Sequence, residues 1–269
     1  MRNIGERNER RLINFLNNKT IKDLPDHFKN PIKAMTYKVT DNCVIQAEKV
    51  SNFIGCKTDF ELTLKGYIIN ISVKQGHFPS LHQEEFKSFI EFLEGLGISK
   101  RTIKILKFYH FRDGTLDGIN PKFQMGFEQF REKYKKYIAE ASEELSQEYI
   151  VRAIVYRGII KGRSPRRQEI DYLYYGNEEK GIFLHKKELL EHTHKYGREK
   201  YTALHFGPIV YTSKYPPKVA KDGTIIHYAV LRWPMMEEDV YKMRNDIDKS
   251  KLEKEEINNS KPTQLKDTL

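Results

Sequence analysis

Residues 57–75 read KTDFELTLKGYIINISVKQ and decide the fold. Polar and apolar residues alternate on both sides of Lys65 and Gly66, which is the period of a half-buried strand. The stretch therefore predicts a β-hairpin that turns at these two residues. Such a hairpin brings Asp59 close to Ser72 and Lys74 on one face. A carboxylate, a second oxygen and a lysine on one face can bind a hard metal ion and activate water, which is chemistry that suits a phosphodiester.

The composition predicts a folded protein with a polyanionic partner. The chain has 269 residues, of which 39% are hydrophobic and 12% aromatic, so it can bury a core. Its formal net charge of +10 favours nucleic acid as the partner, although a basic surface can also serve solubility alone. No apolar run is long enough for a bilayer, and the two cysteines lack metal-ligand spacing. We therefore expect no membrane contact and a cytoplasmic location of the bacterial type.

The remaining pattern predicts an α/β protein in two regions with a tail. Helical spacing is found over residues 7–16, 83–96, 100–111, 127–139, 143–160, 187–196 and 236–248. Strand-like runs occupy residues 43–45, 169–175, 181–185, 204–211 and 224–233. The change of character over residues 141–165 separates a first region, 1–140, from a second, 141–248. Residues 249–269 are charged and lack aromatic side chains, so we expect them to be disordered.

Residues 55–59 (GCKTD) followed by residues 71–74 (ISVK) resemble the core of the PD-(D/E)xK nucleases. The sequence departs from that pattern twice. Cys56 and Lys57 stand where a proline can precede the aspartate, and Ser72 replaces the second acidic residue. The second departure is similar to the small type II restriction endonucleases that cut CCGG and GCGC, the Msp/HinP subgroup, where an amide side chain takes this position.

The resemblance to this subgroup covers most of residues 1–235. Asn8 and Glu9 resemble its N-terminal helix, residues 74–83 resemble the segment that leaves the catalytic strand and enters a helix, and residues 205–231 loosely resemble its C-terminal strands. The resemblance implies a restriction-endonuclease-like core, a mixed β-sheet flanked by helices, with catalytic residues in region 1–140. It also implies an α+β DNA-recognition region within residues 141–248.

The resemblance implies Mg²⁺ as the cofactor, for which Mn²⁺ can substitute. Asp59 is then a direct ligand, the Val73 carbonyl is a further one, and Ser72 offers only a neutral oxygen. Because one carboxylate holds a divalent ion weakly, a second is expected. Candidates for the second carboxylate are Glu9, Glu48 and Glu61. Glu61 shares the face of Asp59 and Glu9 matches the helix position, whereas an exposed surface position is the simpler interpretation of Glu48.

Lys74 is the third expected catalytic residue, beside Asp59 and Ser72. It would position or polarise the attacking water and stabilise charge on the phosphoryl oxygens. The alternative is a surface lysine that forms an ion pair at the end of a strand, an interaction that contributes little to stability.

The expected DNA contacts lie in three places. Gln75 follows the catalytic strand, and Gln83 either contacts DNA near the cleaved bond or caps a helix that starts there. Phosphate contacts are expected from the densest basic stretch, which consists of Arg152, Arg157, Lys161, Arg163, Arg166 and Arg167. Base readout is expected from a loop between two strands, through Thr212, Ser213, Lys214, Lys218 and Lys221. A solvated helix end and an ordinary prolyl loop are the alternatives for the last two places.

These observations favour a Mg²⁺-dependent type II restriction endonuclease that hydrolyses double-stranded DNA at a short palindrome, of four bases in this subgroup, and leaves 5′-phosphates. A monomer or weak homodimer would make the two cuts, and a restriction–modification partner, a DNA methyltransferase, would protect the host genome. Two alternatives remain open. One is a repair or recombination nuclease with the same core, and the other is a DNA-binding protein that has lost catalysis through the change at Ser72.

Overall fold

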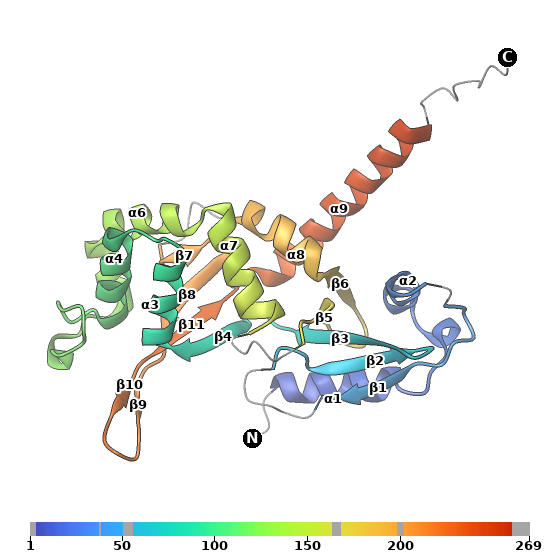
Figure 1. Ribbon diagram of the computed structural model, residues 1–269, viewed down its shortest axis with the longest axis horizontal. Coiled ribbons are helices and arrows are strands. Elements are labelled where there is room, and N and C mark those ends of the chain that lie inside the picture. The colour runs from blue at the N-terminus through green and yellow to red at the C-terminus, as the bar shows by residue number, and fades with distance from the viewer. Residues whose placement is uncertain (1–3, 38, 51–55, 163–167, 198–201, 260–269) are drawn as a thin grey trace.

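The chain folds into two β-sheets flanked by helices, as the computed structural model shows (Figure 1). The structure describes residues 4–37, 39–50, 56–162, 168–197 and 202–259. The coarse expectation of an α/β protein with a mixed sheet is confirmed.

The first sheet has five strands in the order β1-β2-β3-β5-β6. Their bounds are Gln46–Lys49, Phe60–Leu64, Tyr67–Lys74, Tyr172–Gly176 and Gly181–His185. The pair β3–β5 is parallel, and the other pairs are antiparallel. The predicted hairpin is confirmed as β2 and β3, with Lys65 and Gly66 at the turn, both at positive φ. Because β5 and β6 follow residue 140 in the sequence, this sheet draws on both predicted regions.

The second sheet has four antiparallel strands in the order β4-β11-β8-β7. Their bounds are Ser80–Glu85, Tyr228–Arg232, Ile209–Ser213 and His205–Phe206. A two-stranded ribbon, β9 (Lys218–Val219) with β10 (Ile225–Ile226), extends from this sheet away from the body of the molecule (Figure 1). The segment predicted as a loop over residues 212–223 is therefore partly a hairpin.

Nine α-helices are present in the described part of the chain. Their bounds are Ile4–Leu16 (α1), Asp26–Met35 (α2), Phe86–Gly95 (α3), Lys100–Phe111 (α4), Phe127–Lys133 (α5), Lys135–Leu145 (α6), Glu148–Val155 (α7), Lys186–His192 (α8) and Met236–Asn259 (α9). Short helical turns occupy Ile21–Asp23 (η1), Pro121–Phe123 (η2) and Thr193–Tyr196 (η4), and a π-helical turn, η3 (Tyr156–Ile160), continues α7. Ser99 caps α4 by accepting a hydrogen bond from the Thr102 amide.

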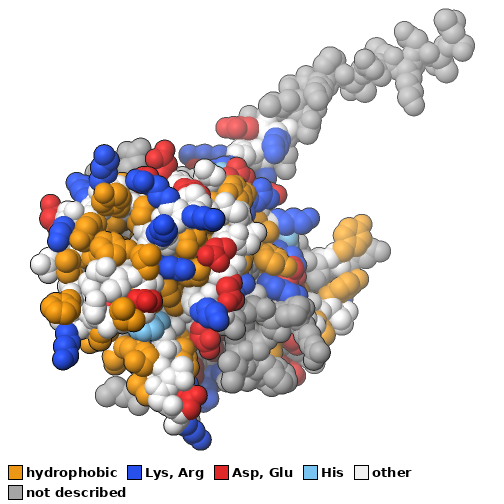
Figure 2. All heavy atoms as spheres, turned by 60° about the vertical axis from the view of Figure 1, so that its left-hand side comes forward, with side chains coloured by type: hydrophobic (Ala, Val, Ile, Leu, Met, Phe, Trp, Pro, Cys, Tyr) orange, Lys and Arg blue, Asp and Glu red, His pale blue; other side chains and the backbone are white. Residues whose placement is uncertain are grey.

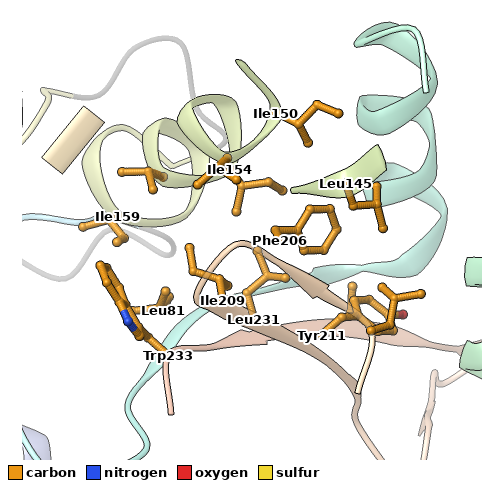
Figure 3. Packing of buried hydrophobic residues seen from close by; sticks show 14 of the residues in the cluster. Leu81, Leu145, Ile150, Ile154, Ile159, Phe206, Ile209, Tyr211, Leu231 and Trp233 are labelled. Atoms are coloured by element: carbon orange, nitrogen blue, oxygen red, sulfur yellow. The ribbon is translucent and has the colours of Figure 1, made fainter. Parts of the chain in front are cut away.

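Two hydrophobic clusters hold the fold together. One joins α1 and α2 to the apolar face of the first sheet, through side chains such as Leu12, Phe28 and Phe60. The other packs α3 to α9 around the second sheet, with Trp233 fully buried. Figure 3 shows Ile154 and Ile159 from the helical layer opposite Leu231 of β11. Both clusters include residues of β5 or β6, so these two strands connect the two halves of the molecule.

Several predicted boundaries were wrong. Residues 80–85 form β4, because they pair with β11 at the other end of the chain, so the predicted helix 83–96 begins only at Phe86. The predicted helix over residues 127–139 is broken at Tyr134, and residues 204–211 turn between two strands. Within the tail expected to be disordered, residues 249–259 continue α9, and residues 260–269 lie outside the described residues.

Candidate active site

The candidate site lies at the edge of the first sheet where the parallel strands β3 and β5 end. Asp59 comes directly before β2, and its amide donates to the Ile71 carbonyl at 2.8 Å. Since Phe60 pairs with Ile71, Asp59 stands opposite Ser72 across the hairpin. The carboxyl ends of parallel strands are the usual position of sites in α/β sheets.

The structure brings Asp59, Ser72 and Lys74 together, as the hairpin register predicts. The Ser72 hydroxyl donates to Asp59 Oδ2 at 3.0 Å, and the Val73 amide donates to the same oxygen at 2.6 Å. Lys74 Nζ donates to the Ser72 hydroxyl at 3.2 Å and to the Val73 carbonyl at 2.8 Å, and it lies 3.7 Å from Asp59 Oδ2. Ser72 is buried, whereas about a fifth of each charged side chain is exposed.

Glu9 is a second carboxylate at this edge. The Asn8 side chain donates to the carbonyl of Gly176, the last residue of β5, at 2.9 Å and so fixes the start of α1 here. The Glu9 carboxylate lies 3.6 Å from Lys49 Nζ. Burial and then the negative charge of Asp59 raise the pKa of Glu9 above its usual value. This influence of Asp59 indicates that the two carboxylates are close enough to repel each other.

Glu48 and Glu61, the other candidate carboxylates, face each other across β1 and β2. Glu61 pairs with Asn70 and therefore lies two residues further along the strand from Asp59. Strand pairing places Glu48 and Glu61 on the first sheet, whereas the effect of Asp59 on the pKa of Glu9 places Glu9 near Asp59 from α1.

The residues at this edge fit a magnesium ion. Within the described part of the chain, the hydrogen bonds to Asp59 reach Oδ2 and leave Oδ1 for a ligand. A cation would also relieve the repulsion between Glu9 and Asp59. No group of three or more His, Cys, Asp or Glu side chains suited to a metal occurs among the described residues. Two carboxylates are nevertheless sufficient for Mg²⁺, which usually retains waters and binds substrate phosphates as well.

Lys57 is a part of this site that the sequence did not reveal. Its Nζ donates to the Leu81 carbonyl at 2.8 Å and lies 3.2 Å from His82 Nδ1. Burial and then the positive charge of Lys74 lower the pKa of Lys57 to about 7, although Asp59 acts in the opposite direction. In the sequence Lys57 stands out only as a departure from the nuclease pattern, because no sequence signal connects it to residues 81 and 82.

A buried ion pair lies behind Lys57. His82 Nε2 is 3.0 Å from Glu84 Oε1, and Arg157 donates two hydrogen bonds to the Glu84 carboxylate, at 2.8 and 2.7 Å. Burial alone would raise the pKa of Glu84, but the hydrogen bonds from Arg157 and His82 lower it to about 2. Burial lowers the pKa of His82, which favours the neutral ring.

The predicted DNA contacts are distributed differently from the catalytic residues. Gln75 is exposed directly after β3. Gln83 is exposed in β4 opposite Val230, so the prediction that it caps or begins a helix was wrong, because strand pairing with β11 takes this segment. Arg163, Arg166 and Arg167 lie outside the described residues. Arg157, from the same basic stretch, is instead bound to the buried Glu84, so the expectation that it contacts a phosphate was wrong.

The ribbon and its base contain the remaining predicted contacts. Thr212 and Ser213 end β8 and make internal hydrogen bonds, to the Val230 carbonyl and from Arg112 respectively. The exposed lysines of this element are Lys214, Lys218 and Lys221. Figure 2 shows basic side chains spread among hydrophobic ones over this side of the molecule, so the charge of +10 is not gathered into one patch there.

Comparisons with family models, with curated proteins and with solved structures gave no match to this chain. None of the helices in the described ranges is both long and apolar enough to cross a bilayer.

Proposed function

We propose that this protein is a Mg²⁺-dependent type II restriction endonuclease with a PD-(D/E)xK-like core. The observation that carries the proposal is the contact of Asp59 with Ser72 and Lys74 at the end of a paired hairpin. In this arrangement a buried serine connects a carboxylate to an ammonium group. An ordinary surface ion pair does not require such a serine. The second carboxylate at this edge, Glu9, also supports a metal-dependent site.

Each group has a distinct role in this proposal. Asp59 and Glu9 would hold Mg²⁺, and the bound ion would supply charge stabilisation to the phosphate. The Val73 carbonyl, expected as a further ligand, accepts a hydrogen bond from Lys74 Nζ at 2.8 Å and would have to release it to bind the ion. The Val73 amide and Ser72 hydroxyl fix the Asp59 carboxylate through Oδ2, so its orientation is set before the substrate binds. Lys74 brings a positive charge to the exposed edge, where it can orient the attacking water and stabilise the developing negative charge.

The substrate of the proposed enzyme is double-stranded DNA that contains a short palindromic site. Its cleavage products carry 5′-phosphates. The β9–β10 ribbon supports this assignment, because a two-stranded ribbon has the dimensions to enter the major groove. Its exposed lysines can pair with phosphates or guanine edges. Since a palindrome requires two cuts, a monomer would cut in turn and a weak homodimer at once. A DNA methyltransferase would be the genetic companion.

Digestion of unmethylated plasmid DNA tests the proposal. Wild-type protein should give discrete bands that require Mg²⁺, and Lys74→Ala should lose them. Lys180→Ala, which removes an exposed lysine paired with Glu237, is the matched control and should cut normally. A smear would favour a repair-type nuclease of the same fold. Intact DNA that is nevertheless retarded on a gel would favour a non-catalytic DNA-binding protein. The replacement of the second acidic residue by Ser72 would then explain the absence of cleavage.

A further inference from the structure

A continuous chain of polar side chains leads from the candidate active site into the second sheet. It consists of Lys57, His82, Glu84 and Arg157, in that order. The Glu84 side chain has no exposed surface, and those of His82 and Arg157 are 7% and 20% exposed. We call these four residues the polar chain.

The contacts of the polar chain are mutually consistent. When Lys57 donates to His82 Nδ1, the His82 proton lies on Nε2 and points to Glu84 Oε1. Arg157 closes the chain with a bidentate pair to Glu84, and its guanidinium lies 4.3 Å from the centre of the Phe92 ring. A buried polar network that is satisfied in this way holds its members in one arrangement.

The polar chain connects two parts of the molecule that the proposed function uses separately. Lys57 comes two residues before Asp59, with the buried Thr58 between them. His82 and Glu84 belong to β4, which pairs with β11, and β11 follows directly from the β9–β10 ribbon. Arg157 is supplied by the π-helical turn η3. The polar chain therefore anchors the segment that enters Asp59 to the sheet from which the ribbon extends.

We propose that Lys57 is a positioning residue of the active site, which the polar chain holds against β4 so that Asp59 meets the metal in one orientation. Lys57 acts through Asp59 rather than on DNA, because its Nζ is directed to the Leu81 carbonyl and the His82 ring. Two anchors then fix Asp59: its own Oδ2 contacts and the tether at Lys57. The inference rests on the proposed function and extends it to residues outside the nuclease pattern.

Direct metal binding distinguishes positioning from a purely structural role. Isothermal titration with Mn²⁺, without DNA, should give an affinity for Lys57→Met at least about tenfold below wild type. Single-turnover cleavage should fall about 10- to 100-fold, as it does when supporting partners of metal ligands are removed. DNA affinity measured by gel shift without divalent ions should stay within about twofold of wild type, because Lys57 is not directed to DNA. Lys57→Arg, which keeps donors for both partners, should recover part of the metal affinity. Lys180→Met is the matched control.

The possible outcomes separate this inference from the proposed function. Wild-type Mn²⁺ affinity and cleavage in folded Lys57→Met would overturn the positioning role and leave the nuclease proposal intact. A wild-type protein that neither binds Mn²⁺ nor cuts DNA would overturn both. If Lys57→Met does not fold, His82→Leu takes its place, because leucine fills the space of the ring but offers Lys57 no acceptor. An unchanged Mn²⁺ affinity in that variant would also overturn the inference.

Discussion

The Ser72 hydroxyl donates to Asp59 Oδ2 at 3.0 Å, although the two residues are 13 positions apart in the sequence. The same hydroxyl accepts from Lys74 Nζ at 3.2 Å. Ser72 therefore links the acidic and basic groups of the site where an acidic residue would stand in the nuclease pattern. A neutral link adds no negative charge, which makes the second carboxylate, Glu9, more important for binding a divalent cation.

Ser72→Ala should lower cleavage without abolishing it. The substitution removes one of the two hydrogen bonds that orient Asp59 Oδ2 and leaves the Val73 amide in place. We expect a decrease of about 10- to 100-fold in the single-turnover rate, as for other partners that orient metal ligands. Thr63→Ala, on the same face of the hairpin, is the matched control. A rate equal to wild type would show that the Val73 amide alone is sufficient.

Glu9→Gln should stabilise the metal-free protein and weaken metal binding. The pKa of Glu9 is raised in the folded state, so its ionised form costs stability at neutral pH. A neutral glutamine removes that cost, and the gain should disappear below about pH 4.5, where glutamate is protonated in both states. Thermal unfolding at pH 7 should therefore give a higher midpoint for the variant without metal.

Addition of Mg²⁺ should reverse this order if Glu9 is a ligand. A ligand that binds only the folded state stabilises it in proportion to the logarithm of its concentration over Kd. With one carboxylate fewer, we expect an affinity lower by about tenfold or more. The wild type should consequently gain more stability from Mg²⁺ than Glu9→Gln. An equal gain in both proteins would exclude Glu9 from the metal site.

Removal of the ribbon lysines should weaken DNA binding and reduce its dependence on salt. Each phosphate contact that is lost lowers the slope of log K against log salt by about 0.9. A variant with alanine at Lys214, Lys218 and Lys221 should lose up to about 2.7 of that slope. The control replaces three lysines around α2, which lies at the opposite side of the molecule in Figure 1: Lys22, Lys29 and Lys33. An equal loss of slope in both variants would show that binding depends on net charge and not on the ribbon.

The hairpin could be predicted because its information is local. Alternating side chains and the turn at Lys65 and Gly66 fix the register, and the register alone places Asp59 opposite Ser72. Glu9 could be proposed only as one of several carboxylates, since its approach to Asp59 depends on how α1 packs. Buried residues such as Val240 and Met243 anchor the first part of α9. The charged residues beyond 248 are good helix formers, so they continue the helix.

The polar chain could not be predicted because its partners are distant in the sequence. Arg157 and Glu84 are 73 residues apart, and Lys57 and His82 are 25 apart. Residues 80–85 also carry no clear alternation, and the helical spacing that begins at Phe86 concealed the strand before it. Pairing with β11 determines that segment as β4, and β11 begins only at Tyr228. Tertiary context therefore decides both the strand and the polar groups buried on it.

His110 should make the folded protein lose stability as the pH falls below about 6.5. The ring is buried in α4 and is hydrogen-bonded to the Tyr211 hydroxyl. It stacks on the Phe86 ring, with 3.7 Å between the two ring centres. Burial and then the positive charges of His227 and Arg112 lower the pKa of His110 to about 3, from 6.5. The neutral His110 ring therefore makes its full contribution to the free energy of unfolding above about pH 6.5. This contribution is lost as the pH falls toward 3. Between these values the unfolded state binds one more proton at this site.

That proton difference can be measured with His110→Gln, which keeps a hydrogen-bonding group for Tyr211. Urea unfolding at several pH values from 7 to 4 gives the free energy of unfolding as a function of pH. One proton corresponds to about 1.4 kcal/mol per pH unit. The wild-type curve should therefore fall more steeply than the variant's by up to this amount below pH 6. Parallel curves would show that His110 is protonated in the folded state as readily as in the unfolded chain.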